Sequence, residues 1–391
     1  MISIIKGCKI YEPRYLGIKD VLITGGKIAG IYDELNIENK LLDIEIIEGK
    51  DKLLFPGFID CHVHIIGAGG EAGYNTRTPE IELSSLIEAG ITTVVGCIGT
   101  DGICRSRKAL IAKVKALRQE GISAYCLIGS YDVPVKTVTG SIKEDIMLIE
   151  EIIGVGEIAL SDNRSSQPNF DSFANLVAQS RVGGLLSNKA GIVNVHLGEG
   201  DRGLNYIFDL IDKTEIPATQ LLPTHINRNG KLFDQGLEYV KKGGFIDLTT
   251  SCDLKNLSEG ELRAGEGLKK YIDENLPIEH ITFSSDGNGS MPEFDDKGKL
   301  IGYKVCCVST LYREVRFAIE QEKIPIEDAI KVITSNIANV LKLENKGTIT
   351  CGKDADLVMV DEKSFDIDAV FAKGKKMMEN GEVLVKGIFE K

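Results

Sequence analysis

Residues 52–64 read KLLFPGFIDCHVH, an apolar run that ends in two histidines one position apart. We expect this run to form a β-strand. Alternate residues of a strand point to the same side, so the imidazoles of His62 and His64 can face one common space. Seven further runs of β-rich sequence follow this run along the chain, and the repetition of these eight runs decides the fold.

The later runs recur with amphipathic helical stretches between them, such as 106–121 and 202–215. Apolar strands separated by helices indicate a parallel sheet covered by helices. Eight such units fit a (β/α)8 barrel. The alternative is an open doubly wound sheet, which would favour a GxGxxG motif after the first strand, and none is found there. The seven runs are ITTVVGCIGT (91–100), SAYCLIGSY (123–131), GEIALSD (156–162), GIVNVHLGEG (191–200), TQLLPTHINR (219–228), GGFIDLTTS (243–251) and HITFSSDG (280–287).

The two ends of the chain show a different pattern. Residues 1–50 and 346–391 hold short alternating runs with glycine turns. Neither segment has enough strands for a stable sheet of its own, but together they could form one small β-sandwich. We therefore expect an α/β protein with two domains: a (β/α)8 TIM barrel over 55–345, and a β-sandwich domain made of 1–54 and 346–391.

The composition argues against several classes of partner. A net charge of -12 argues against nucleic acid and anionic membranes. Nine scattered cysteines without a CxxC pair suit a reducing cytosol. The N-terminal stretch MISIIKGCKIYEP does not read as a signal peptide, and no run of apolar residues is long enough to span a membrane. We expect a cytoplasmic protein.

Four of the five histidines fall at the expected C-terminal ends of barrel strands, where barrel active sites lie. A single interior histidine is more often a hydrogen-bonded core residue. Four at strand ends, with an aspartate ending the eighth strand, favour a metal site, and imidazole with carboxylate suits zinc. His280 lies at the opposite end of its strand, so we expect a structural role for it. The candidate ligands are His62, His64, His196, His225 and Asp286, with Glu157 inside the fourth strand.

These features resemble the metal-dependent amidohydrolase superfamily, through PGFIDCHVH, the single histidines of strands five and six, SSDG on strand eight and GKDADLVMVD near the C-terminus. Within it, the chain is similar to isoaspartyl (β-aspartyl) dipeptidases. The stretches that carry this resemblance are GAGGEAGYNTRTPE (67–80), GTDG (99–102), GSYDVP and TVTGS within 129–141, SDNRS (161–165), THINR (224–228) and SSDGNGS (284–290).

The resemblance implies two zinc ions and a homo-oligomer such as an octamer. His62 and His64 would bind the first zinc, and His196 and His225 the second. Asp286 would complete the first site and act as the proton shuttle. It also implies hydrolysis of isoaspartyl dipeptides, in which a hydroxide shared by the metals attacks the side-chain amide carbon. Asp286 would then pass the proton to the leaving amine.

Glu157 marks a departure from this family pattern. The usual bridging group is a carboxylated lysine, whereas the window GVGEIALSD has Glu157 at that position and no lysine. In one interpretation Glu157 bridges both metals, because a buried carboxylate needs a cation. Its side chain is three links shorter, so the metals or the strand would have to shift. In the other interpretation only one site is well filled and Glu157 is no ligand. We favour the bridge.

The remaining candidate residues would bind a dipeptide substrate. By resemblance, Tyr131 would donate to the developing oxyanion. Glu71 suits the substrate's α-ammonium group, and Arg164 and Arg228 suit its carboxylates. Neutral hydrogen bonds could come from two further side chains, Thr100 and Ser290.

Two other functions compete with this interpretation. An amidohydrolase of cyclic amides, similar to a hydantoinase or dihydroorotase, would bind a substrate without an α-ammonium group and would leave Glu71 without a role. A non-catalytic barrel relative would fit the missing lysine, but the four strand-end histidines and Asp286 argue against it.

Overall fold

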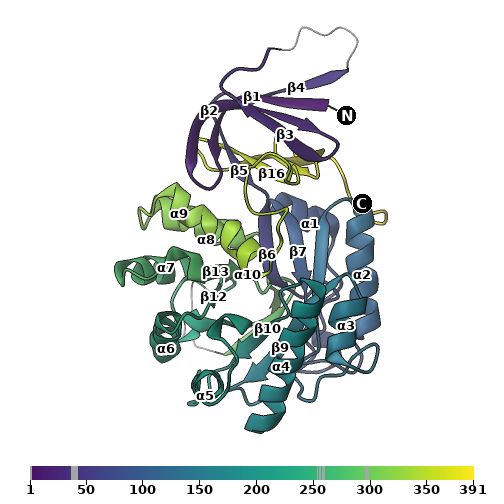
Figure 1. Cartoon of the computed structure of the whole chain (residues 1–391), viewed down its shortest axis with the longest axis vertical. Helices are drawn as coiled ribbons and strands as arrows, with labels where there is room; N and C mark the ends of the chain where they lie inside the picture. Colours follow the sequence, from purple (N-terminus) through teal and green to yellow (C-terminus); the bar gives the residue numbers. More distant parts are fainter. Residues whose placement is uncertain (1, 37–42, 253, 255–256, 258–259, 296–298) are drawn as a thin grey trace.

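Parallel strands and helices alternate through the middle of the chain in the predicted order (Figure 1). The computed structural model describes residues 2–36, 43–252, 254, 257, 260–295 and 299–391. The eight predicted strand runs all form strands within these ranges. They are β6 (Phe58–Val63), β7 (Ile91–Gly96), β8 (Ser123–Ile128), β9 (Ile152–Leu160), β10 (Ile192–Leu197), β11 (Leu221–Thr224), β12 (Ile246–Thr249) and β13 (Ile281–Ser284).

Strands β6 to β11 form one parallel sheet, and β12 and β13 form a second. At one junction Val63 and Gly287 form a parallel bridge just beyond β13. At the other junction, between β11 and β12, the Asn227 side chain takes the place of strand pairing. It accepts a hydrogen bond from Thr249 N (2.8 Å) and donates one to Thr249 O (3.0 Å). The two sheets thus curl into the predicted barrel.

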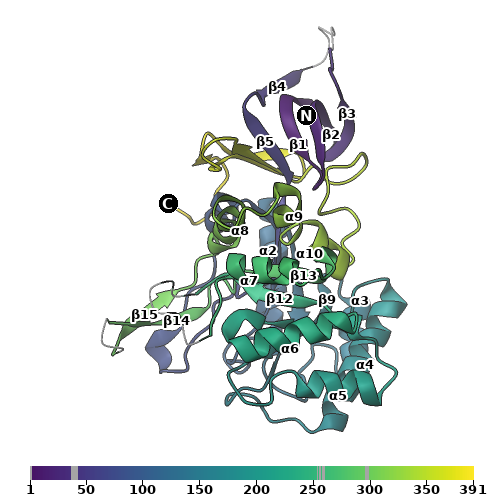
Figure 2. The same cartoon turned by 90° about the vertical axis from the view of Figure 1, so that its left-hand side faces the viewer.

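Helices follow the strands and cover the outside of the barrel (Figures 1 and 2). The helices predicted at 106–121 and 202–215 are confirmed as α2 and α5. Among the described residues, none of the helices is both long and apolar enough to cross a membrane. The helices are α1 (Leu83–Glu88), α2 (Arg107–Glu120), α3 (Ile142–Leu148), α4 (Phe170–Ser187), α5 (Asn205–Lys213), α6 (Gly230–Lys241), α7 (Ala264–Asp273), α8 (Thr310–Glu320), α9 (Ile326–Lys331) and α10 (Ser335–Val340), with 3-10 turns η1 (Tyr74–Thr76), η2 (Ala218–Gln220), η3 (Ile226–Arg228) and η4 (Ile278–His280).

Apolar side chains fill the N-terminal half of the barrel interior. Ile59, Val95 and Ile153 pack there with Ile337 and Leu341, from α10 and the residue after it. Because α10 closes this end, the polar strand ends are confined to the opposite mouth. A hairpin of β14 (Ser290–Phe294) and β15 (Leu300–Val305) projects from the barrel beside that mouth (Figure 2).

The remaining strands come from both ends of the chain and form one mixed sheet at the top of Figure 1. The two ends meet where β5 pairs antiparallel with β16, for example at Phe55 and Val358. The pairing of both termini is as predicted, but the sandwich is not confirmed, because these strands belong to a single hydrogen-bonded sheet. They are β1 (Ile2–Tyr11), β2 (Tyr15–Thr24), β3 (Lys27–Tyr32), β4 (Ile44–Glu48), β5 (Lys52–Pro56), β16 (Leu357–Asp361), β17 (Ile367–Ala372), β18 (Lys375–Glu379) and β19 (Glu382–Val383).

Candidate metal centre and substrate pocket

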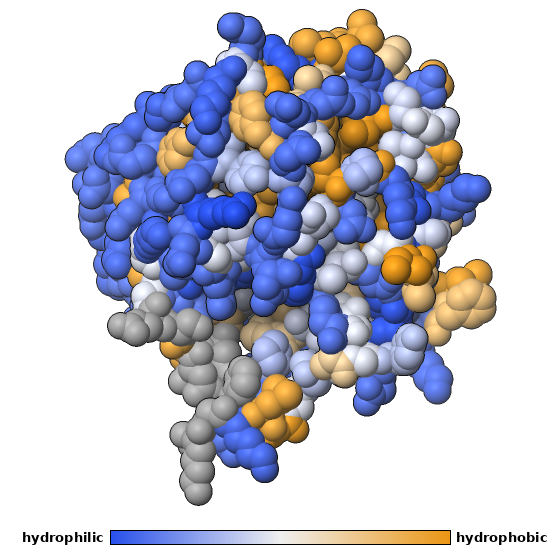
Figure 3. Space-filling view, turned by 90° about the horizontal axis from the view of Figure 1, so that it is seen from below, coloured by the Kyte–Doolittle hydropathy of each residue, from blue (hydrophilic) through white to orange (hydrophobic). Residues whose placement is uncertain are grey.

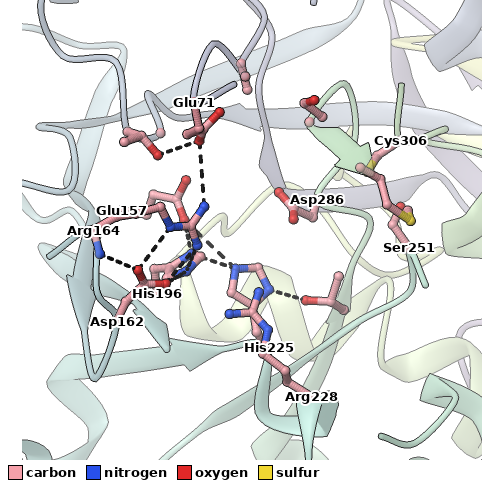
Figure 4. Close-up of a pocket in the computed structure, with 18 of the residues that line it drawn as sticks. Glu71, Glu157, Asp162, Arg164, His196, His225, Arg228, Ser251, Asp286 and Cys306 are labelled. Carbon is pink, nitrogen blue, oxygen red and sulfur yellow. Dashed lines mark hydrogen bonds and ion pairs between the residues drawn. The ribbon is translucent and has the colours of Figure 1, made fainter. Parts of the chain in front are cut away.

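A pocket of about 780 Å³ lies at the C-terminal ends of the barrel strands. Its lining includes Glu157, His196, His225 and Asp286, together with charged residues from the loops that follow the strands (Figure 4). The molecular face opposite the terminal sheet is mainly hydrophilic (Figure 3). A polar cavity in a barrel mouth is the usual place for barrel chemistry.

A β-bulge in β9 positions Glu157. Val155 pairs with Val193 and Ile158 with Val195, so Gly156 and Glu157 together oppose the single residue Asn194. Bulges bend a strand and redirect side chains next to active sites. The side chain of Glu157 enters the barrel interior and is 1 % exposed. This local shift of the strand is the kind of adjustment that a short bridging side chain requires.

Glu157 belongs to two clusters of potential ligand atoms. One contains His62, His64, Cys97 and Glu157, and the other contains Glu157, His196 and His225. The Oε2 atom of Glu157 lies 3.3 Å from His62 Nε2 and 2.9 Å from His196 Nδ1. The Oε1 atom lies 3.5 Å from His64 Nε2. A carboxylate shared by both histidine pairs has the placement of a bridging group.

The buried polar atoms of this centre fit a metal. His62 is fully buried, and neither of its ring nitrogens has a hydrogen-bond partner among the described residues. Buried polar atoms normally make hydrogen bonds, so a buried imidazole without one, beside a buried carboxylate, fits a cation-binding site. His62, His64, Glu157, His196 and His225 therefore form a metal site, and this donor set of imidazole and carboxylate suits zinc and similar ions.

The ionisation states also suit metal ligands. Burial raises the pKa of Glu157, but the surrounding histidines, His62 foremost, outweigh this and hold the pKa well below its usual value. Burial and the neighbouring His196 and Arg228 lower the pKa of His225 to about 3. Glu157 is therefore a carboxylate and His225 a neutral imidazole, the forms that bind metal. Burial lowers the pKa of His62 and His64, but Cys97 and the neighbouring carboxylates outweigh this and raise it, so a metal that binds there displaces a proton from each ring.

Asp286 lies at the solvent-facing side of the first cluster. Its Oδ1 atom is 3.0 Å from His64 Nε2 and 3.7 Å from His62 Nε2. Its side chain is 25 % exposed, whereas the His62 side chain has no exposure at all. Burial raises the pKa of Asp286, but the hydrogen bond from His64 and the charges of His64 and His62 bring it below its usual value. A carboxylate that contacts both the histidines and the pocket can exchange protons between them.

His196 and His225 are each held by a polar neighbour. The Nε2 atom of His196 lies 3.1 Å from Asp162 Oδ2, while its Nδ1 faces Glu157. The hydroxyl of Tyr131 lies 3.0 Å from the same Nδ1. His225 contacts the hydroxyl of Thr249 through its Nδ1. A carboxylate on the outer nitrogen fixes a histidine's orientation and tautomer.

The predicted substrate residues surround the same pocket. Glu71 accepts a hydrogen bond from Thr100 (2.7 Å) and lies 3.6 Å from Arg164 Nη1. Arg164 is also held by Asp162 (2.7 Å). Arg228 lines the pocket and donates to Leu197 O (2.7 Å). Ser290 lines it from the start of β14. Figure 4 shows Glu71 above the Arg164 guanidinium, with a dashed line marking their ion pair.

Two residues of the centre, Cys97 and Asp162, were not assigned to it from the sequence. His280 was correctly placed outside it. Cys97 was given no role, although a cysteine that directly follows an expected strand was a readable signal. Asp162 ends the expected strand 156–162, but the sequence does not connect it with His196, because the two are far apart along the chain. His280 donates from Nδ1 to Gly244 O (2.8 Å), which agrees with the structural role predicted for it.

Comparisons with known proteins indicate amidohydrolases. The model of the amidohydrolase family matches residues 222–386. Dihydroorotase from Acetivibrio thermocellus is 22% identical, over 95% of this chain and 92% of that protein. A D-hydantoinase structure is 16% identical, has a TM-score of 0.69 and covers 100% of this chain and 98% of its own, so it shows the fold alone.

A much higher identity comes from a beta-aspartyl dipeptidase. The crystal structure of this enzyme from Fervidobacterium islandicum, in complex with the beta-Asp-Leu dipeptide, is 47% identical to this chain with a TM-score of 0.90. The match covers 98% of each chain. The chain therefore belongs to the beta-aspartyl dipeptidase family of metal-dependent amidohydrolases.

Proposed function

We propose that this chain hydrolyses the isoaspartyl (β-aspartyl) bond of dipeptides with a dinuclear zinc centre. One observation carries the proposal: a carboxylate, Glu71, and two guanidinium groups, Arg164 and Arg228, line the pocket that holds the histidine clusters. An isoaspartyl dipeptide has one free ammonium group and two carboxylates. These three side chains therefore carry charges opposite to those of the three charged groups of the substrate.

The ligands of the two ions follow from the two clusters. His62 and His64 would hold the first ion, His196 and His225 the second, and Glu157 would bridge them. The ions would supply an activated water molecule and polarise the scissile carbonyl group. We keep zinc as the proposed metal because imidazole and carboxylate ligands suit it.

Asp286 and Tyr131 would handle the proton and the developing charge. Asp286 can take a proton at its Oδ1, which already lies within reach of His64, and release it to the leaving amine. Tyr131 is almost fully buried, and burial raises the pKa of its hydroxyl well above the usual value. The hydroxyl thus stays protonated and can donate to a negative oxygen.

The substrate's charged groups would replace contacts that the pocket residues make with one another. Glu71 would bind the α-ammonium group in place of its ion pair with Arg164. Arg164 and Arg228 would bind the carboxylates, and Thr100 and Ser290 would add hydrogen bonds. Asp162 would keep the Arg164 guanidinium aimed at the pocket.

A substrate panel tests the proposal. We expect the zinc-loaded protein to hydrolyse β-Asp-Leu and to leave hydantoin and dihydroorotate intact. Hydrolysis of a cyclic amide without β-Asp-Leu turnover would replace the proposal with the competing amidohydrolase function. Less than one zinc per chain after zinc-supplemented expression, with no turnover of any substrate, would favour a non-catalytic barrel.

Glu71→Gln tests the assignment of the substrate ammonium group. The amide keeps the shape of the side chain but removes its charge, so we expect kcat/KM for β-Asp-Leu to fall by at least about tenfold, the loss of one charged hydrogen bond. Metal content should not change, because Glu71 lies outside both ligand clusters. An unchanged kcat/KM would remove Glu71 from the substrate site.

We also propose that the chain forms a homo-oligomer. Leu148, Leu185 and Leu186 are exposed on α3 and α4, and large exposed apolar side chains of this kind often mark contacts between subunits. Sedimentation of the purified protein would give the number of copies, for which an octamer is the expectation. The cytoplasmic location also stays a prediction.

A further inference from the structure

Cys97 lies beside the first histidine pair. It directly follows β7 and is fully buried. Its backbone N–H donates to Val63 O (3.0 Å), which fixes it next to the His62–His64 segment. Its Sγ and one ligand atom each of His62, His64 and Glu157 all lie within 4.8 Å of one another. Ligand atoms in a tetrahedral zinc site are about 3.5 Å apart, so only a modest contraction would let one ion reach all four.

The surroundings leave both the sulfur and a nearby imidazole open to a metal. The contacts of the Cys97 Sγ, to Val63 O and His64 Nδ1, are both 3.7 Å, which is long for a thiol that is already a weak donor. Independently, the fully buried His62 has no hydrogen-bond partner at either ring nitrogen within the described ranges. The nearest charged neighbour of its Nε2 is the Glu157 carboxylate of the same cluster (3.3 Å), so an imidazole without a hydrogen bond there points to a ligand shared with the sulfur and the carboxylate.

We propose that Cys97 is a metal ligand that completes the site of His62, His64 and Glu157 with a thiolate. On binding, the thiol releases its proton to solvent and the sulfur forms one bond to the ion, with no change of oxidation state. Asp286 keeps its proposed role in proton transfer at the solvent-facing side. The inference rests on the proposed metal centre but not on the identity of the substrate.

A sulfur ligand also changes which metals the site prefers. Thiolates favour zinc, cobalt and cadmium, whereas magnesium and manganese favour oxygen ligands. We therefore expect the first site to discriminate strongly against magnesium and manganese. A centre of imidazole and carboxylate alone would discriminate less.

X-ray absorption at the zinc edge of the full-length, zinc-loaded protein tests the proposal directly. We expect a sulfur scatterer at about 2.3 Å beside nitrogen and oxygen at about 2.0–2.1 Å. With both sites filled, the average is about one sulfur for every two zinc ions. The cobalt-substituted protein should show the near-ultraviolet charge-transfer band of a thiolate bound to cobalt.

Cys97→Ser should remove both signals. Cys126→Ser is the matched control, because Cys126 is also a fully buried cysteine, lies in the adjacent strand β8 and belongs to neither ligand cluster. This control should keep both signals. If Cys97→Ser does not fold, the spectra of the unchanged protein and of the control still decide the question.

A wild-type spectrum with only nitrogen and oxygen around zinc would overturn the proposal and make Cys97 a hydrogen-bonding neighbour of His64. Assays of β-Asp-Leu hydrolysis on the same samples separate this failure from that of the proposed function. Sulfur ligation without hydrolysis would refute the function alone. Hydrolysis without sulfur ligation would refute the role of Cys97 alone.

Discussion

Glu157 carries a negative charge inside the barrel, where an unpaired carboxylate would be very costly. Its two oxygens lie 2.9–3.5 Å from ring nitrogens of His62, His64 and His196. The negative charge is therefore stabilised only if these histidines hold metal cations or protons. The sequence alone pointed to this residue because an acid interrupted an apolar run. It could not show that one carboxylate reaches both histidine pairs, since that depends on the local path of β9.

Removal of this carboxylate should affect both metals. In Glu157→Ala we expect metal content and turnover to fall together, because the shared ligand is lost from both clusters. Metal analysis and a β-Asp-Leu assay on the same preparation would measure this. Two metals per chain with near-normal turnover would show that Glu157 is not the bridge.

Asp162 should tune the metal through His196. In Asp162→Asn the amide cannot supply the same negative charge to His196 Nε2, and outer partners of this kind change metal affinity by about 10–100-fold. Competition with a chelator would measure the affinity of the second site. Because Asp162 also holds Arg164, KM should rise as well. A raised KM with unchanged metal affinity would limit Asp162 to the substrate side.

The element that decides the geometry of the centre is the bulged strand β9. Periodicity of apolar residues was enough to predict β9 and the other barrel strands, because burial on both faces requires it. It could not predict the bulge at Gly156 and Glu157, which leaves the apolar pattern unchanged but alters which way one side chain points. The junction between β11 and β12 could not be predicted either, because it depends on the side chain of Asn227 and not on a pattern of apolar residues.

Gly156→Ala should disturb this bulge. A Cβ atom at Gly156 would lie 2.9 Å from Asn194 Cβ and 3.0 Å from Asn194 O, in a fully buried part of the sheet. We expect a loss of about 1–3 kcal/mol in the free energy of unfolding, typical of overpacking, together with reduced metal content. Gly302→Ala is the control, because a Cβ atom at Gly302 would have no neighbour closer than 3.9 Å and the φ angle of Gly302 is not positive. Unchanged metal content in Gly156→Ala would separate the bulge from the placement of Glu157.

At the scale of the whole molecule, the barrel and the terminal sheet meet around Lys346. This lysine is 5 % exposed and lies 2.7 Å from Asp354, and it also pairs with Asp356. Asp354 in turn pairs with Lys27 in the N-terminal strands, and Asp356 O accepts from Gly57 N just before the barrel. The sequence predicted two units and their order. It placed the bounds at 54, 55, 345 and 346, and these bounds stay predictions.

Lys346→Met should weaken this junction. Removal of the cation leaves two carboxylates without their buried partner, and breaking a buried pair costs about 3–5 kcal/mol. Thermal unfolding near neutral pH would measure the loss. Lys213→Met is the control, because Lys213 and its partner Asp209 are both exposed and the cost should stay below about 1 kcal/mol.

The loss in Lys346→Met should depend on pH. Burial raises the pKa of Asp354, but Lys346 and Lys27 bring it below its usual value. A carboxylate whose pKa is lowered by folding stabilises the fold above its unfolded pKa and loses this contribution as the pH falls through its folded pKa. The difference between the two proteins should therefore be full at pH 7 and shrink below about pH 4. A constant difference across this range would show that the loss comes from packing and not from charge.

The pairing of Phe55 with Val358 has a consequence for how the molecule forms. During synthesis the first five strands emerge long before β16 exists, so their sheet cannot be completed until the whole barrel has been made. Contacts between residues this far apart in sequence slow folding, and unpaired strand edges favour aggregation in the meantime. We expect the barrel to fold first and to bring the two chain ends together. The C-terminal strands would then pair with the N-terminal strands and complete the sheet.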